Sequence, residues 1–320
     1  MKKSVAVESS AYLPKKKPLL VELKKNLPLL IMLIPGFIMI LLFSYKPLYG
    51  ILIAFKDYKF KDGVLGSAWA GNHGFEHFIR LFKTGDFTRI FFNTIKISFL
   101  KTIFGFAAPI VLALMFNEMR SEAYKRVTQT LSYLPHFFSW VVLGGIFKLL
   151  FASVGPVNSI LQSLGMNEPV SFFGDGQNFV WLIVWTSVWQ SVGWGTIIYL
   201  VALTGVDESL YEAAYIDGAS RWKQVWHISI PSIMGTVSTV LILNMGSILN
   251  AGFDQIYNMY NATVYETSDI LDTYSLRLLQ DGRYELGTAL GLFKSAVGLM
   301  LVLGTNWLVK FISKDEYGVL

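Results

Sequence analysis

Long apolar runs alternate with short polar connections along the chain, which is the pattern of a multi-pass membrane protein. A helix needs about 20 predominantly apolar residues to cross the hydrocarbon core of a bilayer. Six segments meet this requirement, and we predict a membrane-spanning helix over each: Leu27–Tyr45, Ile90–Phe116, Leu131–Phe151, Phe179–Leu203, Ile233–Phe253 and Leu286–Ile312. Pro47 is expected to end or kink the first. The pattern therefore predicts an all-α polytopic fold.

Composition agrees with this class. Only 15% of the 320 residues are charged and 53% are hydrophobic, whereas soluble domains carry about a quarter charged residues. The absence of cysteine excludes disulfides and thiolate metal sites. His73 and His77 are spaced like a metal pair on a helix, but Gly71 and Gly74 argue against a helix there, so no metal site is predicted.

Lysine and arginine concentrate in alternate connections, and cytoplasmic connections carry this excess. The first connection is an exception, because residues 56–89 also contain six lysines and arginines, but this connection is long and acidic, and the rule weakens for long loops. The N-terminal arm is rich in lysine, whereas residues 152–178 contain no lysine or arginine. Both termini are therefore predicted to be cytoplasmic. The net charge of +5 follows from the same bias and does not indicate nucleic-acid binding. The expected organisation is a basic arm (1–26), the first helix and its outer end (27–55), an extracellular loop (56–89), a core of five helices (90–312) with a cytoplasmic loop (206–231), and a cytoplasmic tail (313–320).

One polar stretch between two apolar runs, "YEAAYIDGASRWKQVWHISIPSI", is longer than a simple turn requires. It predicts two short helices around a turn at Gly218, the first capped by Asp207 and the second by Ser220. Pro231 is expected to end the unit. Such a unit either docks into a groove of a partner protein or lies on the lipid headgroups with its tryptophans as anchors.

The spacing within this stretch closely resembles the signature loop of permease subunits of ABC importers. The residues that carry the resemblance are Glu212, Ala213, Ala214, Gly218, Ile228, Ile230 and Pro231. The family usually has leucine where Ile230 stands, and "DGAS" at Asp217–Ser220 is also typical of it. The phrase "NTIKISF" at Asn93 resembles the start of the family's core, and the phrases "IAFKDY" and "FEHF" resemble its carbohydrate-transporting branch that serves oligosaccharides. The resemblance extends over about residues 90–312.

The resemblance implies a type I ABC-importer permease fold in the bacterial cell membrane and a permease that translocates an oligosaccharide. Implied partners are a second homologous permease, a dimer of ATPase subunits and an extracellular substrate-binding (lipo)protein. The loop would be a coupling helix that contacts the ATPase through Glu212, Ala213, Ala214, Asp217, Gly218, Ile228 and Pro231. ATP and Mg²⁺ would be bound by the ATPase subunits, because this chain has no phosphate-binding loop. No cofactor and no catalytic residue is expected on it.

Polar residues inside membrane helices are costly unless they face a cavity or one another. In the fourth predicted helix, Ser187, Gln190, Ser191 and Trp194 share one face, and in the fifth Asn244, Ser247, Ala251 and Asp254 do the same. These faces are candidate sugar-binding surfaces, because sugars bind planar polar groups and aromatic faces. Helix–helix packing explains the same pattern equally well.

Four lysines lie within the predicted spans: Lys96, Lys101, Lys148 and Lys294. Lys96 and Lys148 are near enough to an end for the amine to reach the headgroups. Lys101 and Lys294 are deeper, so each is predicted to face a cavity or to pair with an acid such as Asp254. A cationic vestibule would attract an anionic sugar.

Two other classes of function remain alternatives at this stage, a secondary transporter and a membrane-embedded enzyme. A secondary transporter predicts inverted repeats, which the sequence does not show, and leaves the polar loop without a purpose. The sequence also contains no HExxH or GxSxG motif.

Overall fold

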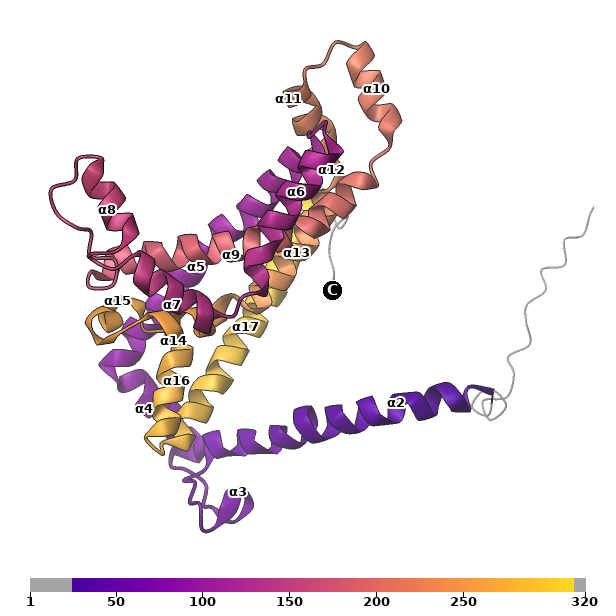
Figure 1. Cartoon of the computed structure of the whole chain (residues 1–320). Helices are drawn as coiled ribbons and strands as arrows, with labels where there is room; N and C mark the ends of the chain where they lie inside the picture. The colour runs from indigo at the N-terminus through magenta and orange to yellow at the C-terminus, as the bar shows by residue number, and fades with distance from the viewer. Residues whose placement is uncertain (1–24, 314–320) are drawn as a thin grey trace, which may run out of the picture. The chain divides into compact units, whose positions relative to one another are not determined.

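The computed structural model describes residues 25–313 (Figure 1). The predicted basic arm and C-terminal tail therefore lie almost wholly outside the described residues. The chain divides into two compact units, Met1–Leu52 and Ile53–Leu320. Within the described part the fold is helical, with one isolated antiparallel bridge between Lys56 and Trp69 as its only β pairing.

The first unit contains α2 (Leu27–Ile40), followed by a π-helical turn at Leu41–Tyr45. A 3₁₀ stretch, Lys46–Phe55, continues the helical path, so the predicted end at Tyr45 is wrong. Pro47 has no N–H to donate and its ring crowds the carbonyl four residues earlier. The wider π-helical turn just before Pro47 lets the chain continue instead of ending.

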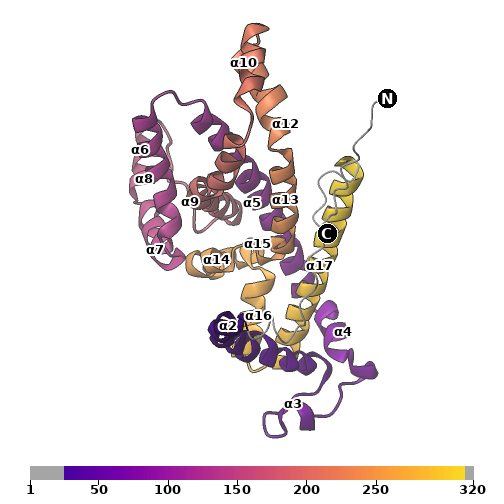
Figure 2. The same ribbon diagram turned by 90° about the vertical axis from the view of Figure 1, so that its right-hand side faces the viewer.

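Two long helices form the centre of the second unit, α5 (Gly85–Asn117) and α9 (Gly176–Thr204), which pack against each other. Near one end Ile97 packs with Phe179 and Ile183. Near the other, Ala113 packs with Tyr199. A second pair, α13 (Met234–Gly246) and α17 (Tyr284–Ser313), lies side by side (Figure 2). The helices predicted at α5, α9 and α17 are confirmed.

The third predicted helix is not straight. It consists of α6 (Glu122–Tyr133) and α7 (Trp140–Leu150), which meet at an angle of 101°. Pro135 lies in the 3₁₀ turn between them, and the hydroxyl of Ser139 caps α7 by accepting from the Val142 N–H at 3.4 Å. A proline and a new N-cap therefore end one helix and start another inside a continuous apolar run.

The fifth predicted helix is also interrupted. It bends by 58° between α12 (Ile230–Ser232) and α13, and α13 ends at Gly246. A 3₁₀ turn, Ile248–Asn250, follows, and two consecutive residues with positive φ, Ala251 (48°) and Gly252 (80°), redirect the chain into α14 (Phe253–Met259). The predicted common helical face of Asn244, Ser247, Ala251 and Asp254 is therefore wrong, because the helix stops among them.

Three described helical runs are long and apolar enough to span a membrane: Leu27–Phe55, Gly85–Asn117 and Tyr284–Phe311. The two bent pairs would raise that number to five. At 29 residues α9 is long enough, but its tryptophans and Gln190 lower its hydropathy. Six spans thus remain a prediction.

Short helices connect the spans: α3 (Gly63–Gly66), α4 (Glu76–Lys83), α8 (Pro156–Ser163), α15 (Tyr265–Ser268) and α16 (Leu271–Gln280). His73 has a positive φ of 57°, as expected of a residue outside a regular helix. The His77 imidazole is buried against the Lys56 carbonyl at 3.1 Å. No cluster of His, Cys, Asp and Glu suited to a metal ion occurs among residues 25–313.

A buried carboxylate ties the start of α16 to the preceding connection. Asp269 is 2% exposed and accepts hydrogen bonds from Thr273 (2.6 Å) and from both terminal nitrogens of Arg277. The hydrogen bonds to Asp269 raise the pKa of the Arg277 guanidinium above its usual value. This cluster fixes α16 to the segment that precedes it.

We predict that Asp269→Asn destabilises the protein by about 1–3 kcal/mol, because Arg277 loses its charged acceptor. The measurement is the melting temperature of the purified protein in detergent. Asp281→Asn is the matched control, since Asp281 is exposed at the end of the same helix, and it should change stability by no more than about 0.5 kcal/mol. Equal shifts for both variants would contradict the assignment.

Candidate functional site

The polar stretch folds as the sequence predicts and projects at one end of the second unit (Figure 1). It consists of α10 (Glu208–Ile216) and α11 (Arg221–Gln224), followed by a π-helical turn at Val225–Ser229 that leads into α12. We refer to residues 206–231 as the coupling loop. Two short helices around Gly218 are confirmed. The Ser220 side chain makes no capping hydrogen bond, and Pro231 does not end the unit, because it lies in the first turn of α12, where its missing N–H is tolerated.

At both ends of α10, backbone groups that have no partner within the helix form hydrogen bonds. At its start the Asp207 carboxylate accepts from the Ser209 N–H at 2.9 Å, and this hydrogen bond lowers the pKa of Asp207. At its end the Ala219 N–H donates to the Ala214 carbonyl at 2.8 Å and the Gly218 N–H to the Tyr215 carbonyl at 3.0 Å. These two bonds form a Schellman motif, with Gly218 at a φ of +74° as the left-handed residue that the motif requires. The position of the turn is therefore determined locally, by the glycine at residue 218.

One polar contact fixes the coupling loop to the rest of the second unit, and another joins its two parts. Arg221 donates to Glu118, next to the end of α5, at 2.8 Å. The Tyr211 and Ser229 hydroxyls lie 2.9 Å apart and connect α10 to the π-helical turn. A cleft of about 690 Å³ lies between α10, α11 and the ends of α5 and α9.

The outer side of the coupling loop carries large apolar side chains that nothing in the second unit covers. Their exposed fractions are 79% for Tyr215, 83% for Ile216, 74% for Trp222 and 61% for Trp226. The predicted coupling residues Glu212, Ala213, Asp217, Gly218 and Pro231 are exposed as well, and Ala214 and Ile228 are half-buried. Exposed large apolar side chains beside acidic groups make this loop a candidate interaction surface.

A second candidate site is a polar cleft of about 300 Å³ at the break between α13 and α14. We refer to it as the membrane cleft. Three of the predicted substrate residues line it: Ser187, Asn244 and Ser247. The intramembrane lysine Lys101 also lines it, as expected of a residue predicted to face a cavity. Four further lining residues come from α5: Ser98, Thr102, Gly105 and Phe106.

The contribution of α5 was missed at the level of sequence. Thr94, Ser98, Lys101, Thr102 and Gly105 are spaced three and four residues apart, which places small and polar residues on one helical face. That periodicity was a readable signal for the membrane cleft. Of the residues on this face, only Lys101 was predicted to face a cavity, because its charge is costly inside a membrane helix.

The other predicted substrate residues lie outside the membrane cleft. Gln190 donates to the His136 carbonyl at 3.3 Å, and the Trp194 ring stacks on the His136 imidazole with 4.7 Å between ring centroids. Ser191 donates to the Ser187 carbonyl at 2.8 Å. Gln190 and Trp194 thus contact the bend between α6 and α7. Asp254 is exposed on α14, beyond the helix break.

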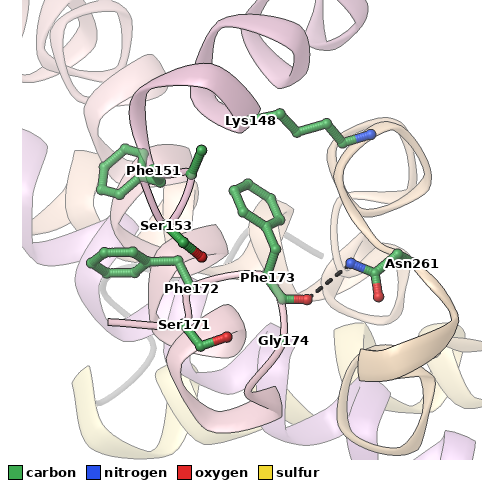
Figure 3. Close-up of a pocket in the computed structure, with 9 residues that line it drawn as sticks. Lys148, Phe151, Ser153, Ser171, Phe172, Phe173, Gly174 and Asn261 are labelled. Atoms are coloured by element: carbon green, nitrogen blue, oxygen red, sulfur yellow. Dashed lines mark hydrogen bonds between the residues drawn. The ribbon is translucent and has the colours of Figure 1, made fainter. Parts of the chain in front are cut away.

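Lys294 has an acidic partner, as predicted for a deep lysine, but the acid is Asp272 and not Asp254. The two carboxylate oxygens lie 2.6 and 2.8 Å from its ammonium nitrogen. Lys148 stands at the rim of a separate pocket of about 320 Å³, with Phe151 and Phe172 on one side and Asn261 on the other (Figure 3). The Asn261 amide there donates to the Phe173 carbonyl at 2.9 Å.

Comparisons with known proteins agree with this arrangement. Residues 105–315 match the family described as "Binding-protein-dependent transport system inner membrane component". Protein LplB of Bacillus subtilis (strain 168) is 43% identical over 295 residues, 92% of each chain. The polygalacturonan/rhamnogalacturonan transport system permease protein YteP of the same organism is also 43% identical, over 94% of this chain and 93% of its own length.

A solved structure shares the fold over nearly the whole chain. It is the crystal structure of a bacterial alginate ABC transporter in complex with an alginate pentasaccharide-bound periplasmic protein. The superposition covers 95% of this chain and 100% of that one, with a TM-score of 0.84 and 37% sequence identity. This chain therefore belongs to the family of binding-protein-dependent transport system inner membrane components, the multi-pass permeases of ABC importers.

Proposed function

We propose that the chain is the membrane-spanning permease subunit of an ABC importer and translocates an oligosaccharide that an extracellular binding protein delivers. The observation that carries the proposal is the coupling loop, a capped helix pair whose apolar outer side and acidic residues are exposed. A loop of this construction needs a partner protein, and the family supplies ATPase subunits as that partner. The sugar part rests on the names of YteP and of the alginate transporter.

The partners follow the same reasoning. A binding protein is supported by the alginate transporter, whose structure contains a periplasmic protein loaded with a pentasaccharide. We further propose a second homologous permease beside this one, six spans in each, and both termini in the cytoplasm. ATP and Mg²⁺ are bound by the ATPase dimer, so this subunit carries no cofactor and is not itself an enzyme.

The structure suggests how the two candidate sites are linked. From the coupling loop the chain runs through α12 into α13 (Figure 2). Asn244 in the last turn of α13 and Ser247 just beyond it line the membrane cleft. Closure of the ATPase subunits would displace α10, and α13 would carry the displacement to the cleft. Hinges at element ends are the usual places where such movements are absorbed. The bend at Ile233 and the break at Ser247–Gly252 are hinges of this kind.

The membrane cleft suits a sugar because its lining offers hydroxyl, amide and ammonium groups in a region where polar groups are costly. Ser187, Ser247 and Asn244 can exchange hydrogen bonds with sugar hydroxyls, and the Phe106 ring offers an apolar face for the C–H surface of a pyranose. The partner permease would close the open side of this cleft.

The first prediction from this proposal concerns the side of the membrane that the coupling loop faces. The chain has no cysteine, so Ser209→Cys or Ser220→Cys would introduce a single thiol at an exposed position. In intact cells each thiol should react with a membrane-permeant maleimide but not with an impermeant one, and it should cross-link to the ATPase subunit. Ser153→Cys, in the connection predicted to be extracellular, is the control that both reagents should label. Labelling of Ser209→Cys by the impermeant reagent would refute the topology.

The second prediction concerns Gly218, whose added Cβ would meet no atom within 4 Å, so its substitution acts through φ alone. Valine at a positive φ costs about 1–2 kcal/mol, whereas asparagine tolerates this conformation better. We expect Gly218→Val to lose sugar uptake and sugar-stimulated ATPase activity while the subunit remains in the membrane. Gly218→Asn should keep most activity, and Gly205→Ala, at the preceding helix end with a negative φ of −86°, should keep all of it. Near wild-type rates for Gly218→Val would show that the turn is not needed for coupling.

A further inference from the structure

Lys101 occupies the middle of the longest described membrane helix. It lies 16 residues from each end of α5 (from 85 to 101 and from 101 to 117). At 1.5 Å per residue, about 24 Å of helix separates it from either end. A lysine side chain cannot reach the headgroups from this depth, so snorkelling does not explain the residue. An ionisable group at such a position points to a substrate or ion pathway.

The ammonium group of Lys101 has only neutral partners. It donates to the Ala251 carbonyl at 2.8 Å and to the side-chain oxygen of Gln255. Gln255 is itself held in place, because its amide donates to the Ile183 carbonyl and to the Thr186 hydroxyl, each at 2.8 Å. Within residues 25–313 no carboxylate lies within 4.0 Å of Lys101. Lys294, in contrast, is neutralised by Asp272.

Lys101 thus has a fixed position and an uncompensated charge. Gly252 makes the position possible, because an added Cβ would lie 2.5 Å from the Lys101 nitrogen. Two of the three ammonium donors are used by Ala251 and Gln255, which leaves one for a group in the membrane cleft. A positive charge in a region of low dielectric is stabilised when an anion enters beside it.

A second group in the same cleft lacks a partner. Ser98 lies one helical turn before Lys101 and is 3% exposed, and its hydroxyl forms no hydrogen bond with any described residue. A serine inside a helix commonly donates to the carbonyl four residues earlier. Thr94 on the same helix does so, to Ile90 at 2.8 Å. Within the described part of the chain, the Ser98 hydroxyl has no hydrogen-bond acceptor, and the ammonium group beside it has no carboxylate partner. Together they form a site for an acceptor from outside the chain.

We propose that Lys101 and Ser98 bind a carboxylate of the sugar in the membrane cleft, and that the imported oligosaccharide is therefore acidic, with uronate units. The inference rests on the proposed function and names its substrate class. A purely structural lysine would cap the break between α13 and α14, and that role requires a hydrogen-bond donor but no charge. The presence of a charge, beside an unsatisfied hydroxyl, favours recognition of an anion.

The test compares trigalacturonate with its fully methyl-esterified form, which has the same sugar backbone but no carboxylate charge. The protein is the complete transporter with its partner permease and ATPase subunits. Binding of each sugar to the detergent-purified complex is measured by calorimetry without the binding protein, so that the specificity of the binding protein does not enter. Uptake into proteoliposomes with the binding protein is measured in parallel. The variants are Lys101→Gln, Lys101→Arg and Ser98→Ala, with Lys96→Gln as a control because Lys96 is exposed on the same helix.

We expect Lys101→Gln to weaken binding of trigalacturonate about tenfold or more and to leave binding of the ester unchanged. Lys101→Arg should keep most of the affinity, Ser98→Ala should lose less than Lys101→Gln, and Lys96→Gln should match the wild type. High salt should weaken binding of trigalacturonate by the wild type and not by Lys101→Gln.

Equal losses for both sugars, or a wild type that binds the ester as tightly as the acid, would overturn the proposal while leaving an oligosaccharide permease in place. Absence of any sugar-dependent uptake and ATPase stimulation in the wild type would instead refute the proposed function. Melting temperatures identify a variant that fails to fold. If Lys101→Gln fails to fold, Lys101→Arg, Ser98→Ala and the salt dependence of the wild type still decide between the outcomes.

Discussion

Every backbone polar group inside a bilayer needs a partner, and the break between α13 and α14 is where this chain must satisfy that constraint. The solution joins three helices that are distant in sequence. Lys101 of α5 donates to the Ala251 carbonyl, and Gln255 of α14 donates to Ile183 and Thr186 of α9. Irregular backbone is tolerated at membrane depth only where protein buries it or where it lines a cavity. The same contacts that stabilise the break therefore create the polar space that a permease requires.

A helix that ends inside the membrane also allows the segments on either side of its end to move separately. Helix α13 has a bend at one end and the break at the other, and it packs against α17. A short rigid element between two hinges moves as a unit. In the proposed importer this element is the connection between the coupling loop in water and the hydroxyl and amide groups in the lipid. An uninterrupted helix could not move its cytoplasmic half against a fixed outer half.

The coupling loop was predictable because its determinants are local. Asp207, Gly218 and the apolar spacing between them lie within a short stretch, and capping rules act on neighbours. The bends at Pro135 and Ala251 were not predicted, because the apolar pattern continues through both. Hydropathy reports what surrounds a segment and not whether its backbone is straight. The contact that stabilises the second break links residues 150 positions apart, and no local pattern contains it.

The exposed aromatic residues of the coupling loop have a consequence for the life of the subunit in the cell. The side chains of Trp222, Trp226 and Tyr215 are exposed in this subunit alone, and in the proposed importer they would meet water whenever the ATPase is absent. Such surfaces cause aggregation, and chaperones and proteases act on proteins that expose them. A permease made in excess of its ATPase would thus be a target for degradation by cellular proteases. In the proposed importer, the surface that transmits the movement of the ATPase would therefore also keep the numbers of the two subunits matched.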